Sequence, residues 1–109
     1  MKWGTAWKTA NIDYYQLHYY DWLYQYYPYT THTLAGAGLT NKPVVMGEFP
    51  NAGVSALGLP SRTASQLTAD LWNQGYAGAL GWAYNDSSFP WDPSAVSTFA
   101  AQHPCEVAY

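Results

Sequence analysis

Three short stretches of this chain have the hydrophobic patterns of β-strands. From residue 13 to 20, period-two spacing puts Gln16, His18 and Tyr20 on one face and more apolar side chains on the other. Residues 44–47 form a continuous apolar run, which is typical of a parallel strand covered on both faces. Residues 76–84 alternate small and large side chains, which favours a strand closely approached by a helix.

Apolar residues spaced by three and four positions predict helices around these strands. The candidate helices are residues 3–10, a short one at 30–37 that glycines bring to an end, 63–74 and 93–100. Thr63 and Gln66 have the spacing of a capping box, and Gly75 supplies a C-terminal stop. Asp92 and Pro93 are a typical N-cap and first-turn pair. Residues 51–60 are rich in Gly, Ala, Pro and Ser, which predicts a surface loop.

The order α-β-α-β-α-β-α predicts one α/β domain over residues 1–109, with a parallel sheet. Parallel strands end at the same edge of a sheet, so Tyr20, Glu48 and Trp82 are expected to be neighbours. Glu48 is the main candidate for chemistry, because it is a lone acid at the end of an apolar strand, where α/β folds bind ligands. The structural alternative is that Glu48 is the first exposed residue after the strand.

The composition is poor in charge and rich in aromatic side chains. Charged residues make up 10% of the chain, against about 25% in typical domains. Eight of the 11 tyrosines lie between residues 14 and 29. Because each buried phenol needs a hydrogen-bond partner, we expect these tyrosines to line a wet, aromatic surface rather than the core.

Charge and cysteine content argue against several classes of partner. With a formal net charge of −3 and four cationic residues, the chain lacks the basic patch that nucleic-acid binding needs. The single Cys105 has no disulfide or metal-site companions, so we expect no metal and no cofactor. No stretch is apolar enough to span a membrane or to act as a signal peptide, and the sequence indicates no compartment.

Three motifs resemble a known family. His18-Tyr19-Tyr20-Asp21, residues 42–49 (KPVVMGEF) and residues 75–82 (GYAGALGW) are similar to the ends of strands six, seven and eight of a retaining clan A glycoside hydrolase. The greatest likeness is to glycoside hydrolase family 5, the cellulase and mannanase type. The resemblance implies a partial (βα)8 TIM barrel of about three parallel βα units that acts on a β-linked glucan or mannan. It makes Glu48 the nucleophile, His18 and Tyr20 residues that line the substrate site, and Trp82 a sugar platform.

The chain also departs from that family. The family's acid/base glutamate follows an asparagine at the end of strand four, and this sequence contains no Asn-Glu pair. Retaining hydrolysis uses two carboxyl groups about 5 to 5.5 Å apart. Asp21 and Asp86 follow the first and third strands and could supply the second group, although both residues also fit turn or capping roles. His18 as proton donor and a carboxyl group from another copy are further alternatives.

Three strands cannot close a barrel, and an open parallel sheet has two unpaired edges. We therefore expect a homo-oligomer that completes the partial barrel by self-association. Low charge and abundant Tyr and Trp are typical of such interfaces. Two other functions remain alternatives to hydrolysis, namely carbohydrate binding without turnover and a purely structural, oligomerising role.

Overall fold

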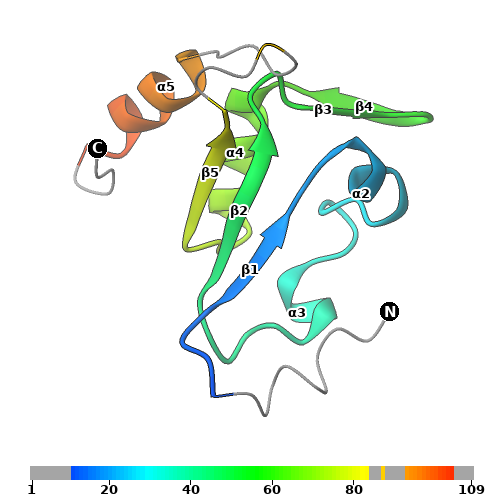
Figure 1. Cartoon of the computed structure of the whole chain (residues 1–109), viewed down its shortest axis with the longest axis vertical. Helices are drawn as coiled ribbons and strands as arrows, with labels where there is room; N and C mark the ends of the chain where they lie inside the picture. The colour runs from blue at the N-terminus through cyan, green and yellow to red at the C-terminus, as the bar shows by residue number, and fades with distance from the viewer. Residues whose placement is uncertain (1–10, 84–86, 88–92, 105–109) are drawn as a thin grey trace.

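A computed structural model describes residues 11–83, 87 and 93–104 of the chain. Three strands form a parallel sheet in the order β1-β2-β5, with Tyr15–His18 as β1, Val44–Pro50 as β2 and Gly78–Trp82 as β5 (Figure 1). The predicted α/β class and the parallel pairing of the three strands are confirmed. A separate two-stranded sheet pairs β3 (Val54–Ala56) with β4 (Leu59–Arg62).

The strands are parallel, with one register shift in each pair, so their carboxyl ends lie at one edge of the sheet. His18 of β1 pairs with Glu48 of β2, and Trp82 of β5 pairs with Pro50 of β2. The expected grouping of the three strand ends is therefore confirmed. Along β1, Tyr15 is buried whereas His18 is exposed, which follows the predicted alternation.

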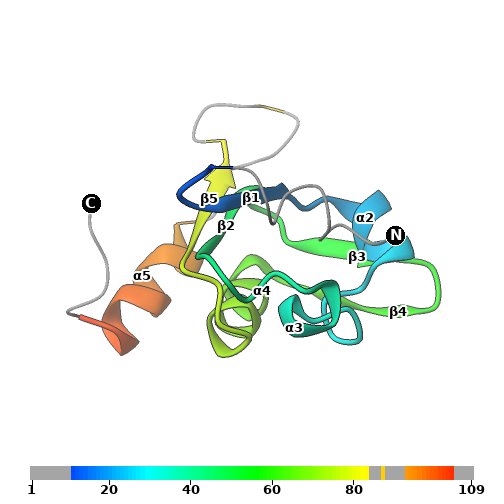
Figure 2. The same ribbon diagram turned by 90° about the horizontal axis from the view of Figure 1, so that it is seen from below.

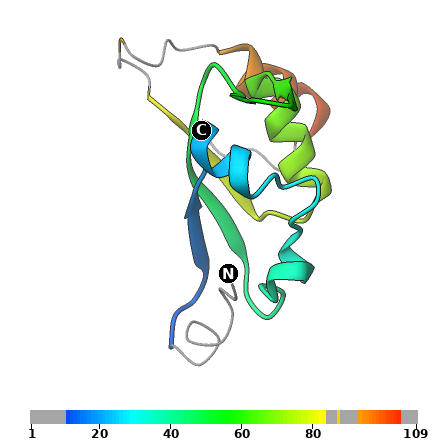
Figure 3. The ribbon, with the colours of Figure 1, turned by 90° about the vertical axis from the view of Figure 1, so that its right-hand side faces the viewer.

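The helices are α2 (Asp21–Tyr26), α3 (Leu34–Ala37), α4 (Ala64–Asn73) and α5 (Ser94–Gln102). Figures 2 and 3 show α3, α4 and α5 on the same side of the sheet, whereas α2 follows the carboxyl end of β1. No described helix covers the opposite face. The prediction that helices cover both faces of β2 is therefore wrong for the described residues, and Val45 and Glu48 are only half-buried.

The caps that the sequence indicated are present. The Thr63 side chain accepts a hydrogen bond from Gln66 N (3.3 Å), and the Gln66 side chain accepts one from Thr63 N (3.1 Å), so the capping box of α4 is confirmed. Gly75 follows α4 with φ +84°, a conformation that favours glycine. Helix α5 begins one residue after Pro93. The expected cap Asp92 and the expected helix at 3–10 lie outside the described residues.

The predicted loop at 51–60 is wrong, because most of it folds as the β3–β4 hairpin. Ala56 pairs with Leu59 across a turn in which Gly58 has φ +76°. Gly53 also has a positive φ, and a Cβ there would lie 1.9 Å from the Arg62 carbonyl oxygen. The two strands have three and four residues, too few for a period-two pattern to appear in the sequence.

The expectation that the tyrosines avoid the core is wrong for Tyr15, Tyr19, Tyr24 and Tyr29, all of which are buried. Each of these phenols has the hydrogen-bond partner that burial requires. The hydroxyls donate to Asn41 Oδ1 (3.1 Å), the Tyr27 carbonyl (2.9 Å), the Pro60 carbonyl (2.6 Å) and Asp70 Oδ2 (2.5 Å), respectively. The core is completed by aliphatic side chains such as Met46, Leu67 and Leu71.

Candidate active site

Glu48 lies near the carboxyl end of β2, the central strand of the parallel sheet. Its neighbours Met46 and Phe49 are buried and hold the strand in the core, while 27% of the Glu48 side chain is exposed. The Glu48 carbonyl accepts a hydrogen bond from Tyr19 N (2.8 Å), which fixes β1 beside it. The carboxylate is thus carried by a rigid element and still reaches solvent.

Two side chains from the end of β1 converge on one oxygen of this carboxylate. The Tyr20 hydroxyl donates to Glu48 Oε2 at 2.9 Å, and His18 Nδ1 lies 3.4 Å from the same oxygen. No hydrogen bond from a described residue reaches Oε1. The structure therefore brings together three of the four principal predicted site residues, and it leaves one carboxylate oxygen without a partner in the described part of the chain.

Gln16 extends this cluster, and the sequence reasoning did not select it. Gln16 Nε2 lies 3.0 Å from His18 Nε2, so Gln16, His18 and Glu48 form a row across β1 and β2. A Cβ on Gly47 would lie 2.3 Å from Gln16 Nε2, so glycine makes room for the Gln16 side chain. The signal was present in the alternation that placed Gln16 on the same face as His18 and Tyr20.

Trp82 ends β5 at the same edge of the sheet. Its side chain is 43% exposed, and the residue pairs with Pro50, two positions beyond Glu48 on the neighbouring strand. The Trp82–Ala83 peptide bond is cis. Trp82 thus ends its strand at the edge that also carries Glu48, and its residue is partly exposed.

The two candidates for a second carboxyl group have different outcomes. Asp21 Oδ1 accepts a hydrogen bond from Ser55 N (2.9 Å), which joins the start of α2 to strand β3. It is a tertiary contact, different from the turn or capping role that was the alternative, and helix α2 has no side-chain cap. Asp86 lies outside the described residues. The hydrogen bonds and ion pairs that Glu48 makes with described residues involve no second carboxyl group.

The described residues contain no group of three or more His, Cys, Asp or Glu side chains that could hold a metal ion. Within the same residues, no helix is both long and apolar enough to cross a membrane.

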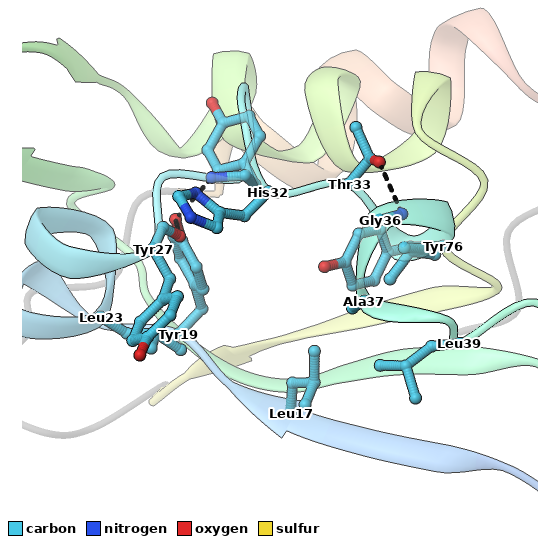
Figure 4. Close-up of a pocket in the computed structure, with 12 residues that line it drawn as sticks. Leu17, Tyr19, Leu23, Tyr27, His32, Thr33, Gly36, Ala37, Leu39 and Tyr76 are labelled. Atoms are coloured by element: carbon cyan, nitrogen blue, oxygen red, sulfur yellow. Dashed lines mark hydrogen bonds between the residues drawn. The ribbon is translucent and has the colours of Figure 1, made fainter. Parts of the chain in front are cut away.

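A separate apolar cavity of about 160 Å³ lies between β1, α2 and α3 on the helix-covered side of the sheet (Figure 4). Leu17, Leu39 and Tyr76 line one part of it, and Tyr19 and Tyr27 line another. The Tyr19 hydroxyl donates to the Tyr27 carbonyl and accepts from Tyr29 N (3.0 Å), so it is committed to the fold. Burial raises the pKa of Tyr76 to about 12 and also raises that of Tyr19.

No protein-family model, curated protein or solved structure matches this chain. The resemblance to a glycoside hydrolase therefore stays a prediction that depends on the motifs around Glu48, His18, Tyr20 and Trp82. The parallel sheet and the cluster at its carboxyl edge are observed in the structure itself and do not depend on that resemblance.

Proposed function

We propose that Glu48 is the nucleophile of a retaining glycoside hydrolase site directed at a β-linked glucan or mannan. The observation that carries this proposal is the convergence of Tyr20 and His18 on Glu48 Oε2 at the carboxyl edge of a parallel sheet. That edge is where α/β folds assemble ligand sites. Trp82 at the end of the adjacent strand would form one wall of the sugar site.

The arrangement of layers supports the finer fold assignment, a partial TIM barrel. Parallel strands in sequential order with helices α3, α4 and α5 on one side are what a segment of a (βα)8 barrel has. A doubly wound sheet would have helices on both faces. In a barrel the uncovered face would be the interior, and Gln16, His18 and Glu48 would point into it.

The chemistry required of Glu48 is attack on the anomeric carbon of the substrate. A carboxylate oxygen forms a covalent glycosyl-enzyme as the glycosidic C–O bond breaks, and water later hydrolyses that intermediate. Tyr20 and His18 both bind Oε2, so they would orient the carboxylate with Oε1 toward the sugar. This role differs from that of a proton donor, because both groups face the nucleophile.

The leaving oxygen must receive a proton in the first step, and no partner of Glu48 among the described residues is a second acid. Activated aryl leaving groups depart without that proton, whereas the alkoxide of a natural glycan does not. We therefore expect the protein to release an activated aryl leaving group far faster than it cleaves polysaccharide. A carboxyl group from Asp21, Asp86 or a second copy would restore polysaccharide cleavage.

The direct test is covalent labelling with a 2-deoxy-2-fluoro aryl glycoside, which traps a glycosyl-enzyme. Gluco and manno forms should each be tried, and peptide mass spectrometry should place the adduct on Glu48. Glu48→Gln should prevent labelling, whereas Asp13→Asn, which changes an exposed acid before β1, should not. An adduct on another residue, or no adduct with an intact fold, would contradict the proposed nucleophile.

Carbohydrate binding without turnover is a second candidate, favoured by the 43% exposure of Trp82 at the site edge. A flat exposed indole can stack on a sugar ring without any acid in place. Isothermal titration with cellohexaose and mannohexaose tests it. Measurable affinity combined with no labelling of Glu48 would favour the binding function over hydrolysis.

A further inference from the structure

A larger cavity, of about 460 Å³, lies between β5 and the helices α4 and α5. Its volume falls in the range of small-molecule sites, roughly 300–1,000 Å³. The lining that matters here is Phe49, Asn51, Thr68, Trp72, Val96 and Phe99. None of the residues in the Glu48 cluster lines it, so this cavity is distinct from the candidate active site.

Aromatic and aliphatic side chains form most of the cavity wall. Trp72 of α4 packs edge-on against Phe99 of α5, with ring centroids 5.5 Å apart and planes at 71°. Phe49 is buried in β2, and Val96 is partly exposed on α5. Such a wall favours a flat apolar molecule over an ion or a sugar.

Asn51 is the polar exception, and the fold holds it firmly. It follows β2 directly, is 3% exposed, and donates its backbone N–H to the Trp82 carbonyl at 3.3 Å. A Cβ on Gly81 would lie 2.3 Å from Asn51 Oδ1, so only glycine at 81 leaves room for this amide. The amide therefore lies against β5 at the cavity wall.

The Asn51 side chain has an unused donor. Its Nδ2 atom is buried and has no hydrogen-bond partner among the described residues. A buried donor without a partner destabilises the state that contains it. The Thr68 hydroxyl, by contrast, already donates to the Ala64 carbonyl at 2.8 Å. Because Nδ2 is buried, the amide must turn toward the cavity that Asn51 lines before an oxygen acceptor there can satisfy it.

We propose that this cavity binds a small aromatic molecule that carries one acceptor oxygen. The oxygen accepts a hydrogen bond from Asn51 Nδ2, and the ring packs against the wall that Trp72 and Phe99 form together. Apolar burial supplies most of the affinity and the single hydrogen bond selects the ligand's orientation. This site does not depend on Glu48 or on the hydrolase proposal.

The test compares acetophenone, which has a carbonyl oxygen, with ethylbenzene, which has nearly the same shape and no acceptor. Binding to the full chain is followed by NMR through the indole N–H of Trp72. We expect acetophenone to bind about tenfold more tightly, because only it satisfies the buried donor. Asn51→Ala should remove that preference and leave ethylbenzene binding unchanged.

Two further variants locate the site. Val96→Phe should fill the cavity and weaken both probes, whereas Leu57→Phe, at the 90% exposed hairpin turn, should affect neither. Equal affinity of the wild-type protein for the two probes would overturn the proposal. A preference for acetophenone that survives in folded Asn51→Ala would also overturn it. If Asn51→Ala does not fold, unchanged binding of both probes to Val96→Phe would overturn the proposal instead.

Discussion

Two tyrosine–carboxylate hydrogen bonds in this chain use the same pair of side-chain types in opposite settings. On the helix-covered side of the sheet, the Tyr29 hydroxyl donates to Asp70 Oδ2 at 2.5 Å, with Arg62 Nε 3.5 Å from the same oxygen. On the uncovered face, the Tyr20 hydroxyl donates to Glu48 Oε2 at 2.9 Å. The Tyr29 ring is buried, whereas Tyr20 is only half-buried.

The contact between Tyr29 and Asp70 joins distant segments of the chain. Tyr29 lies in the turn after α2, Asp70 on α4 and Arg62 on β4, so one carboxylate joins three parts of the fold. Burial raises the pKa of Tyr29, and the hydrogen bond to Asp70 and its negative charge raise it further. This pair stabilises the structure.

The pair on the open face joins only β1 and β2, which backbone hydrogen bonds already hold together. Tyr20 and His18 both lie close to its Oε2, and no hydrogen bond from a described residue reaches Oε1. The comparison teaches that the same side-chain pair can link distant segments in one place and leave a carboxylate oxygen without a partner among the described residues in another. The proposed nucleophile belongs to the second kind.

The largest expected effect separates the two carboxylates by function. Glu48→Gln should lower the rate of aryl-glycoside hydrolysis by on the order of 10⁴-fold, because the nucleophile is lost. Its free energy of unfolding should change by less than about 0.5 kcal/mol, because Gln at 48 can still accept the Tyr20 hydrogen bond and backbone hydrogen bonds already pair β1 with β2. Initial rates and urea unfolding measure the two quantities.

Asp70→Asn is the matched variant on the helix-covered side of the sheet. It should lower the free energy of unfolding by roughly 1–3 kcal/mol, because the contacts with Tyr29 and Arg62 are weakened. Activity per folded molecule should not change. The comparison fails if Asp70→Asn abolishes turnover in the folded state, or if Glu48→Gln unfolds the protein.

The next effect concerns alkaline pH and the covered side of the sheet. Burial raises the pKa of Tyr76 from 10.0 to about 12, and Tyr19 and Tyr29 shift in the same direction. The folded protein therefore holds these protons more tightly than the unfolded chain. The corresponding stability is fully present below about pH 10 and is lost as the pH rises through the folded values.

For Tyr76 the loss should amount to about 2 kcal/mol by pH 12. Urea unfolding at a series of pH values, with tyrosinate absorbance recorded in parallel, measures it. Tyr76→Phe should flatten this part of the profile, and Tyr14→Phe, which changes an exposed tyrosine, serves as the control. A profile that Tyr76→Phe leaves unchanged would assign the alkaline transition to other groups.

The sequence predicted the features that repeat along the chain. Apolar runs and alternation gave the three parallel strands, and the Thr63 and Gln66 spacing gave the start of α4. Parallel pairing then predicted that Tyr20, Glu48 and Trp82 share an edge, because this follows from topology alone. The contacts of Glu48 with His18 and Tyr20 were consistent with their shared face on β1.

The rest depends on contacts between distant residues. Asp70 lies 41 positions from Tyr29, and nothing in the local pattern of either residue indicates their hydrogen bond. Helix α2 buries the adjacent residues Leu23 and Tyr24, so its six positions show no clear helical period. Alternation placed Gln16 on the face of His18, but the room for its side chain beside Gly47 is seen only in the structure.

A smaller effect tests whether the unpaired strand edges lead to association with another copy of the chain. The outer edges of β1 and β5 are paired with no described strand, and exposed strand edges favour association with another chain. We expect a homo-oligomer whose apparent stability rises by about 1.4 kcal/mol for each tenfold increase in concentration of a dimer. Sedimentation equilibrium measures the assembly, and a monomer mass at every concentration would contradict it.

The smallest effect tests whether the uncovered edge binds sugar. In the Glu48→Gln background, where turnover is prevented, Trp82→Ala should weaken cellohexaose or mannohexaose binding by up to about tenfold, as the loss of one ring-stacking contact predicts. Trp22→Ala is the control, because Trp22 is 62% exposed on α2 and is not part of the β2–β5 edge.

Isothermal titration measures both variants. Trp82 pairs with Pro50 of β2, the strand that also carries Glu48. A loss confined to Trp82→Ala would therefore place the sugar across the carboxyl edge of β2 and β5. Equal losses in both variants would indicate stacking on any exposed indole. Unchanged affinity in Trp82→Ala would remove Trp82 from the site and leave Glu48, His18 and Tyr20 as a cluster without a platform.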